Sequence, residues 1–237
     1  MNRSITFILV TTILLLPALV FAGPFDMLKK GDDSKGGAKV DVNGLSGRAT
    51  TLIVKVAKAT ISFGEAVVEI QYAVGKAASA EKLKAAIDNA KAKKDDTDNI
   101  KALVGEVNNA VNEMNKVDLN SQIDLTKARV SMGKSILNFG VGVIMDMGAV
   151  SDAKTLMAEA TNALKTVQAA PTQYGPAAVK NVQSVITSSQ FVVENIPPQA
   201  NSIQIFSGKL MDYAKTNKIE LPSQAEIDKK AKDMEKE

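Results

Sequence analysis

The sequence predicts an all-α protein, a bundle of about six to seven helices with two long apolar helices at its centre. Apolar residues recur at helical spacings of three and four over most of the chain. Runs of alternating β-branched and polar residues between turn signals, which would indicate strands, are missing. Aromatic residues make up 4% of the chain and Trp is absent, so Ala, Val, Ile, Leu and Met must fill the core.

The first 22 residues have the pattern of a secretory signal peptide. Arg3 supplies a positive charge, an apolar run follows, and Val20–Ala22 has the small-x-small pattern that precedes a cleavage point. Pro17 interrupts the apolar run, which is short for a membrane anchor because spanning takes roughly 20 apolar residues. We therefore expect cleavage near Ala22 and a periplasmic or secreted protein. Residues 23–45, which contain GDDSKGG, are expected to form a flexible leader.

The first long helix is expected over residues 46–77. Its polar residues follow one another in steps of three and four and trace one narrow stripe: Lys55, Lys58, Ser62, Glu65, Glu69 and Lys76. Nearly all its other residues are apolar, which indicates a helix buried over most of its circumference. Shorter helices are expected over 79–93 and 98–116, the second behind an Asp/Thr cap.

A second long helix, over residues 120–149, repeats the pattern of the first. Its polar stripe consists of Asp124, Lys127, Ser131, Lys134, Asn138 and Asp146. Residues 58–68 align with residues 127–137, with matching Lys, Ala, Ser and Gly positions. This alignment favours an internal duplication of a three-helix unit of about 70 residues. The alternative is coincidence between two helices of similar composition.

The rest of the chain is expected to form shorter helices. Ser151 is expected to cap a helix that runs to Ala169, and two further helices are expected over 176–195 and 199–217. Pro197-Pro198 should separate the last two, because proline cannot continue the hydrogen bonding of a helix. The bundle domain would therefore cover residues 46–217. The tail, 218–237, opens with the capping box of Ser223 and Glu226 and should be a short, charged, solvated helix.

Composition excludes several kinds of chemistry. Cys and His are both absent, which rules out Ser-His-Asp and Cys-His catalysis, zinc sites built on these residues, and disulfides. Without Arg3, 28 basic and 26 acidic side chains remain, a net charge of +2 with the two signs interspersed. This pattern is unlike a nucleic-acid groove. We therefore expect no nucleic-acid partner, no cofactor and no enzymatic activity.

Two groups of charged residues have structural interpretations. Asp95, Asp96 and Asp98 lack the Gly and Glu positions of an EF-hand calcium loop, so a helix-capping turn is expected there and no metal site. Glu65 and Glu69 lie one turn apart on the first polar stripe. We expect them to form cross-helix ion pairs with the second long helix, in which Lys134 aligns with Glu65.

The stretch from Ser135 to Met145 is the main candidate for function. It has no charged residue and contains two glycines, each of which costs roughly 1 kcal/mol in a helix interior compared with Ala. Such glycines favour either close helix–helix crossing or a pliable segment that enters a membrane. The candidate residues for crossing or lipid contact are Gly64, Gly133, Ile136, Leu137, Phe139, Gly140, Gly142, Val143 and Ile144.

Two functions follow from these features. The first is an exported, non-enzymatic bundle with a binding or structural role in the cell envelope or outside the cell, with a protein partner or self-association. The alternative is a membrane-active protein, lipid-binding or pore-forming, that inserts its glycine-containing apolar helices. Apolar segments in a long bundle resemble the architecture of helical pore-forming toxins, an analogy that does not assign function.

Overall fold

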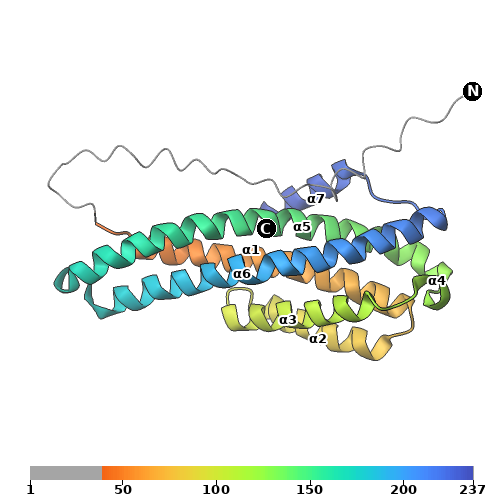
Figure 1. The fold of residues 1–237 in the computed structure, drawn as a ribbon, viewed down its shortest axis with the longest axis horizontal. Helices are drawn as coiled ribbons and strands as arrows, with labels where there is room; N and C mark the ends of the chain where they lie inside the picture. Colours follow the sequence, from red (N-terminus) through yellow and green to blue (C-terminus); the bar gives the residue numbers. More distant parts are fainter. Residues whose placement is uncertain (1–38, 237) are drawn as a thin grey trace, which may run out of the picture. The chain divides into compact units, whose positions relative to one another are not determined.

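The computed structural model describes residues 39–236, so the expected signal peptide and most of the expected leader lie outside the described residues. From Val42 onward the chain forms one compact unit, drawn in Figure 1. Its helices are α1 (Val42–Ala73), α2 (Ala77–Ala92), α3 (Thr97–Met114), α4 (Leu119–Gln122), α5 (Leu125–Ala169), α6 (Pro171–Thr216) and α7 (Gln224–Lys236). The described residues contain no strand, and the predicted all-α bundle is confirmed.

Three long helices, α1, α5 and α6, form the centre of the bundle. Each packs against the other two, and Figure 1 shows α5 and α6 side by side. The rings of Phe63, Phe139 and Phe206 come one from each of these helices. The Phe139 ring centroid lies 6.4 Å from that of Phe63 and 5.8 Å from that of Phe206. Apolar packing among three helices, rather than the two that were expected, therefore makes the core.

Polar contacts fix the antiparallel register of α1 and α5. The Ser135 hydroxyl donates to the Ala66 carbonyl over 3.1 Å, and Lys134 pairs with Glu69 over 3.1 Å. Nearer the other end, Arg48 pairs with Glu159. The predicted cross-helix ion pairing is thus confirmed at Glu69, whereas Glu65 pairs with Lys91 of α2, 2.8 Å away.

Helices α2 and α3 form a hairpin that packs on α1, and α3 also packs on α6. The Asp96 carboxylate caps α3 by accepting from the backbone N–H groups of Asp98 and Asn99. The predicted capping turn is therefore confirmed. Within residues 39–236, no group of three acidic side chains is placed to hold a metal ion.

Helix α5 does not break where a break was expected. Ser151 lies in its interior, and the carbonyl of Ser151 accepts from the Thr155 hydroxyl over 3.3 Å. The prediction of a new helix at Ser151 is wrong because the buried face continues through it, with Ala149, Ala153 and Leu156 all in the core. One helix of 45 residues stands where two were predicted.

Helix α6 likewise continues through Pro197-Pro198, so the predicted break there is wrong. The two prolines are exposed, while Ile196 and Gln199 on either side of them are buried. Packing of this inner face holds the helix together although the prolines lack N–H groups. The predicted start at Pro176 marks a kink, because Gly175 inside α6 has a φ of 74°.

The C-terminal helix α7 begins with the predicted capping box. The Ser223 hydroxyl and backbone N–H both donate to the Glu226 carboxylate over 2.7 Å. The expectation of a solvated tail is wrong, however, because Ile227 and Ala231 are buried where α7 packs on α5. The reason is a glycine: Gly140 leaves room on α5 for the Ile227 side chain.

Candidate functional site

Between residues 135 and 150, α5 is apolar on its outward side as well as on most of its core side. The polar side chains of this stretch, Ser135, Asn138 and Asp146, are buried. Apart from Gly148, its partly or fully exposed residues form a set that we call the apolar stripe: Leu137, Gly140, Val143, Ile144, Met147 and Val150. A helix on the surface of a water-soluble bundle normally has a polar outward side. This segment therefore presents its apolar side outward.

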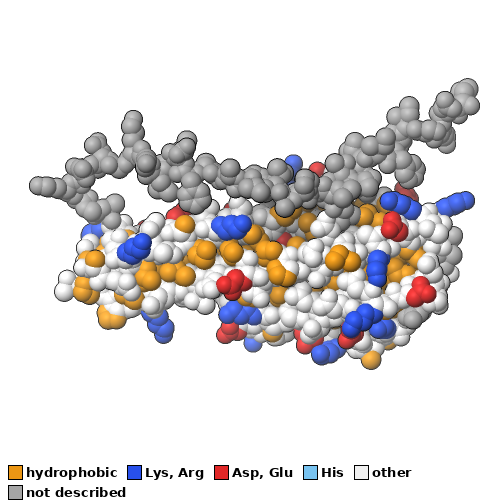
Figure 2. Space-filling view, in the orientation of Figure 1, with side chains coloured by type: hydrophobic (Ala, Val, Ile, Leu, Met, Phe, Trp, Pro, Cys, Tyr) orange, Lys and Arg blue, Asp and Glu red, His pale blue; other side chains and the backbone are white. Residues whose placement is uncertain are grey.

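The residues of the apolar stripe share one side of α5. Their spacings of three and four place them on neighbouring turns of one helix face. Met147 is the most exposed of them, with 54% of its surface accessible. The opposite side of the helix faces the core, where Gly142 lies against the Phe63 ring of α1. Figure 2 shows hydrophobic side chains gathered in patches along the face on which α5 and α6 lie.

The structure divides the nine predicted candidate residues into three groups. Leu137, Gly140, Val143 and Ile144 belong to the apolar stripe. Ile136, Phe139 and Gly142 lie in the core. The expected crossing of Gly64 with Gly133 does not form. A Cβ on Gly64 would lie 2.8 Å from Ile87 of α2, and one on Gly133 would lie 3.4 Å from the Glu220 carbonyl.

The candidate residues predicted from the sequence do not include Met147 and Val150, because the uncharged stretch of the sequence ends before Asp146. In the structure the Asp146 side chain is buried, 1% exposed, so the outward apolar side continues past it. The helical spacing of Met147 from Gly140 and Ile144 was the signal that could have extended the candidate set.

Asp146 is the most unusual buried group in the described part of the chain. Neither of its carboxylate oxygens has a hydrogen-bond partner among residues 39–236. Burial raises the pKa of this carboxyl well above its ordinary value, because removal from water disfavours the charged form. A carboxyl that faces the inside of a bundle, with apolar residues on the outward side of the same helix, is also found in membrane-spanning helices.

Other polar groups lie at the level of Asp146. Gly142 lies against Phe63 and Gly148 against Lys55, so the antiparallel register places Asp146 beside the turn of α1 that carries Thr60. The buried Thr60 hydroxyl donates to Oε1 of Gln199 in α6 over 3.5 Å. The Nε2 atom of Gln199 has no partner among the described residues. The three long helices therefore each place a polar group in the middle of the core.

The length and composition of α5 fit a bilayer. Among the described helices, the part from Ser131 to Ala169 is the one segment long and apolar enough to cross a membrane. Half of its most apolar 18-residue window is buried within the bundle. A core helix of a water-soluble protein passes the same test when it is mostly buried. Length and composition are shared by such core helices, and the apolar stripe is the feature of α5 that favours lipid contact.

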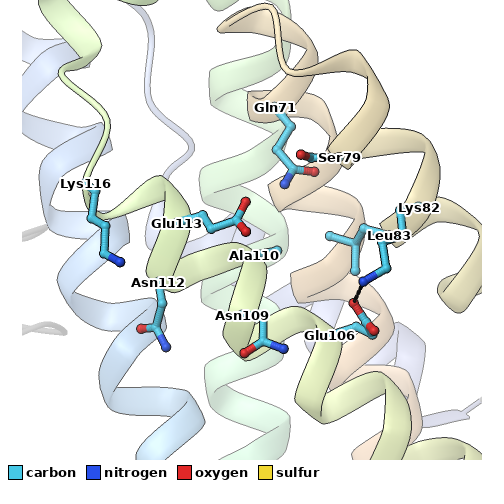
Figure 3. Close-up of a pocket in the computed structure, with 10 residues that line it drawn as sticks. All are labelled: Gln71, Ser79, Lys82, Leu83, Glu106, Asn109, Ala110, Asn112, Glu113 and Lys116. Atoms are coloured by element: carbon cyan, nitrogen blue, oxygen red, sulfur yellow. Dashed lines mark ion pairs between the residues drawn. The ribbon is translucent and has the colours of Figure 1, made fainter.

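A second candidate is a polar pocket of about 330 Å³ between α1, α2 and α3, shown in Figure 3. Lys82 and Glu106 form an ion pair of 3.0 Å in its wall. Gln71 is 1% exposed, its Oε1 atom has no partner among the described residues, and its amide lies beside Ser79 (Figure 3). The remaining lining residues are Leu83, Asn109, Ala110, Asn112, Glu113 and Lys116. Amides and charges of both signs suit a small polar molecule.

The apolar stripe and the polar pocket differ in kind. The stripe is an extended apolar surface on one helix, and the pocket is a small polar hollow between three helices. Comparisons with models of protein families, with curated protein sequences and with solved structures each found no match.

Proposed function

We propose that this chain is an exported, non-enzymatic helical bundle that binds lipid bilayers through the apolar stripe of α5. The single observation that carries the proposal is the apolar outward side of residues 135–150, whose polar side chains Ser135, Asn138 and Asp146 are all buried. Export is supported by the signal-like sequence that ends near Ala22.

Contact with a lipid surface would explain in physical terms why residues 135–150 are apolar on their outward side. A contiguous apolar patch exposed to water is rare on monomeric soluble proteins and marks a contact surface. In hydrocarbon the same patch costs nothing, while a carboxyl such as Asp146 is tolerated only inside the bundle and uncharged. The competing occupant of the stripe is a protein, either a partner or a second copy of this chain.

The structure offers a matched pair of variants to test the proposal. In the described part of the chain, Met147 and Ile205 are the two large hydrophobic side chains that are strongly exposed, at 54% and 55%. Met147 belongs to the stripe on α5, and Ile205 lies on α6. Met147→Glu should reduce vesicle binding at least about tenfold, because a charge in the lipid contact costs well over 1.4 kcal/mol. Ile205→Glu should leave binding within about twofold.

The measurement is flotation of the chain beginning at Gly23 with vesicles of phosphatidylethanolamine and phosphatidylglycerol, with release of a trapped dye as a second readout. Circular dichroism checks that each variant keeps its helical content. Equal losses of vesicle binding for Met147→Glu and Ile205→Glu would overturn the proposal, because binding would then depend on the overall hydrophobicity of the surface and not on the apolar stripe. A wild-type chain that neither floats nor releases dye, but whose oligomer dissociates on Met147→Glu, would assign the stripe to self-association.

A second candidate function is the binding of a small polar molecule in the pocket between α1, α2 and α3. The observation that favours it is the buried Oε1 of Gln71, an acceptor without a partner among the described residues. A zwitterionic amino acid or a monosaccharide would match the mixed charges and amides of the wall. Such a ligand should raise the melting temperature of the wild type but not of Asn109→Leu. Equal shifts for both would place binding elsewhere.

A further inference from the structure

We infer that the lipid-contact surface of α5 continues beneath α7, and that α7 is a displaceable cover which a bilayer replaces. This inference rests on the proposed function and adds to it a hidden part of the surface and the segment that controls access. Gly140 connects the two parts, because it belongs to the apolar stripe and also forms the seat of α7.

The seat of α7 is a notch at Gly140. A Cβ built on this glycine would lie 2.8 Å from Cγ2 and 2.9 Å from Cδ1 of Ile227. Any other residue at position 140 would therefore push the isoleucine away. The Ile227 side chain occupies the surface of α5 that a larger side chain would otherwise cover.

Few other contacts hold α7 in place. Its buried hydrophobic side chains are Ile227 and Ala231. Lys230 Nζ donates to Asn138 Oδ1 over 2.5 Å, and Lys58 Nζ donates to the Met234 carbonyl over 2.9 Å. With 13 residues, α7 is near the length at which an isolated helix is marginal in water. Because the buried hydrophobic side chains of α7 are Ile227 and Ala231, its departure would expose little apolar surface of its own.

The surface of α5 beneath α7 includes Gly140 and one polar side chain. Asn138 is buried on α5, and its amide oxygen accepts a hydrogen bond from Lys230 of α7. Removal of α7 would widen the exposed apolar side of α5 around Gly140. A bilayer is the occupant that fits because the adjoining stripe, Gly140 to Val150, is already apolar and uncharged on its outward side. Lipid would then compete with α7 for this surface.

A disulfide lock tests the inference cleanly, because the chain contains no cysteine. Gly140→Cys with Ile227→Cys would tie α7 to α5, since the second substitution removes the isoleucine atoms that crowd position 140. The matched control is Gly64→Cys with Ile87→Cys, which ties α2 to α1 at another notch where an isoleucine crowds a glycine, with Cδ1 of Ile87 2.8 Å from a Cβ built on Gly64. Both variants are compared oxidised and reduced.

The readout is dye release from vesicles of phosphatidylethanolamine and phosphatidylglycerol. Oxidation of the α7 lock should lower release at least about tenfold, because it removes the open state from the population, and reduction should restore it. Oxidation of the α2 lock should leave release unchanged. Full release from the oxidised α7 lock would overturn the cover while leaving lipid binding intact. A wild type that neither floats with the vesicles nor releases dye would instead reject the proposed function.

Ile227→Ala supplies an independent test if either lock folds poorly. It weakens the seat without adding a crosslink, so the open state should become more populated and dye release should rise about tenfold. An unchanged release rate, with α7 shown by hydrogen exchange to be less protected, would also overturn the inference.

Discussion

Helices α2 and α7 share a local seat but differ in how the rest of the bundle holds them. Each places an isoleucine against a glycine of a long helix, Ile87 against Gly64 and Ile227 against Gly140. In both cases a Cβ built on the glycine would lie 2.8 Å from the nearest isoleucine atom. Helix α2 also buries Leu83 and packs against both α1 and α3. Helix α7 packs mainly against α5.

Ion pairs add to the difference. Lys91 and Lys82 connect α2 to Glu65 of α1 and Glu106 of α3. The ion pair of Lys236 with Asp233, by contrast, lies within α7 itself. An isoleucine packed against a glycine therefore positions a helix on the bundle, but this contact alone does not determine whether the helix can detach. Because α2 is enclosed by α1 and α3, it belongs to the cooperative core. Because α7 packs mainly on one helix, it can detach from the bundle while the rest stays folded.

The largest expected effect compares the two isoleucines. Ile87→Ala should lower the free energy of unfolding by about 3 kcal/mol, because it leaves a cavity that enclosed neighbours cannot fill. Ile227→Ala should lower it by less than about 1 kcal/mol, because α7 can detach while the bundle stays folded. Urea unfolding monitored by circular dichroism measures both. Equal losses would show that α7 belongs to the cooperative core.

The next effect concerns pH and the helix on which α7 docks. Burial raises the pKa of Asp146 in the folded state, so the folded chain holds this proton more tightly than the unfolded chain. The free energy of unfolding should therefore fall as pH rises from the ordinary Asp range through the raised pKa. Asp146→Asn should remove this slope, so the variant should become more stable than the wild type as pH rises above the ordinary Asp range. If the free energy of unfolding changed with pH by the same amount in the wild type and the variant, the burial of Asp146 would be contradicted.

A smaller effect compares the two notches. Gly64→Ala should lower the free energy of unfolding by about 1 kcal/mol, because its Cβ would press on Ile87 within an enclosed site. Gly140→Ala should leave it unchanged or raise it by up to about 1 kcal/mol, because alanine favours the helix and α7 can move aside. Amide hydrogen exchange should then be faster in α7 alone. Slower exchange there would show that α7 tolerates the methyl group in place.

The smallest effect compares two lysines. Lys91→Ala removes an exposed ion pair of α2 and should cost about 0.5 kcal/mol of global stability. Lys230→Ala removes the bond to Asn138 and should speed hydrogen exchange in α7 without a change in the urea midpoint. A shifted midpoint for Lys230→Ala would again place α7 in the core.

Local sequence patterns were enough to predict the all-α class and two of the helix caps. Spacing identified α1 and the first part of α5, and the caps at Asp96 and Ser223 formed as expected. The continuity of α5 through Ser151 and of α6 through Pro197-Pro198 could not be predicted locally. In both helices the buried faces on either side of the expected break outweigh the local signals for ending a helix.

The candidate site was only partly predictable for a related reason. Asp146 and Asn138 fitted a polar stripe together with exposed Lys134, and sequence spacing alone assigns such a stripe to solvent. The structure places Asp146 and Asn138 inside instead, because α1 and α6 pack on α5 and Lys230 of α7 covers Asn138. The docking of α7 depends on a contact between residues 140 and 227, far apart in the sequence.

The central claim, lipid contact through the apolar stripe, is tested most directly with a single fluorescent label. Because the chain has no cysteine, Met147→Cys and Ile205→Cys each offer one site for an environment-sensitive dye, at positions of nearly equal exposure. On addition of vesicles, we predict a blue shift and brighter emission from the label at position 147 and no change at position 205. A label at position 147 that keeps its aqueous spectrum while the protein is bound to vesicles would contradict the account.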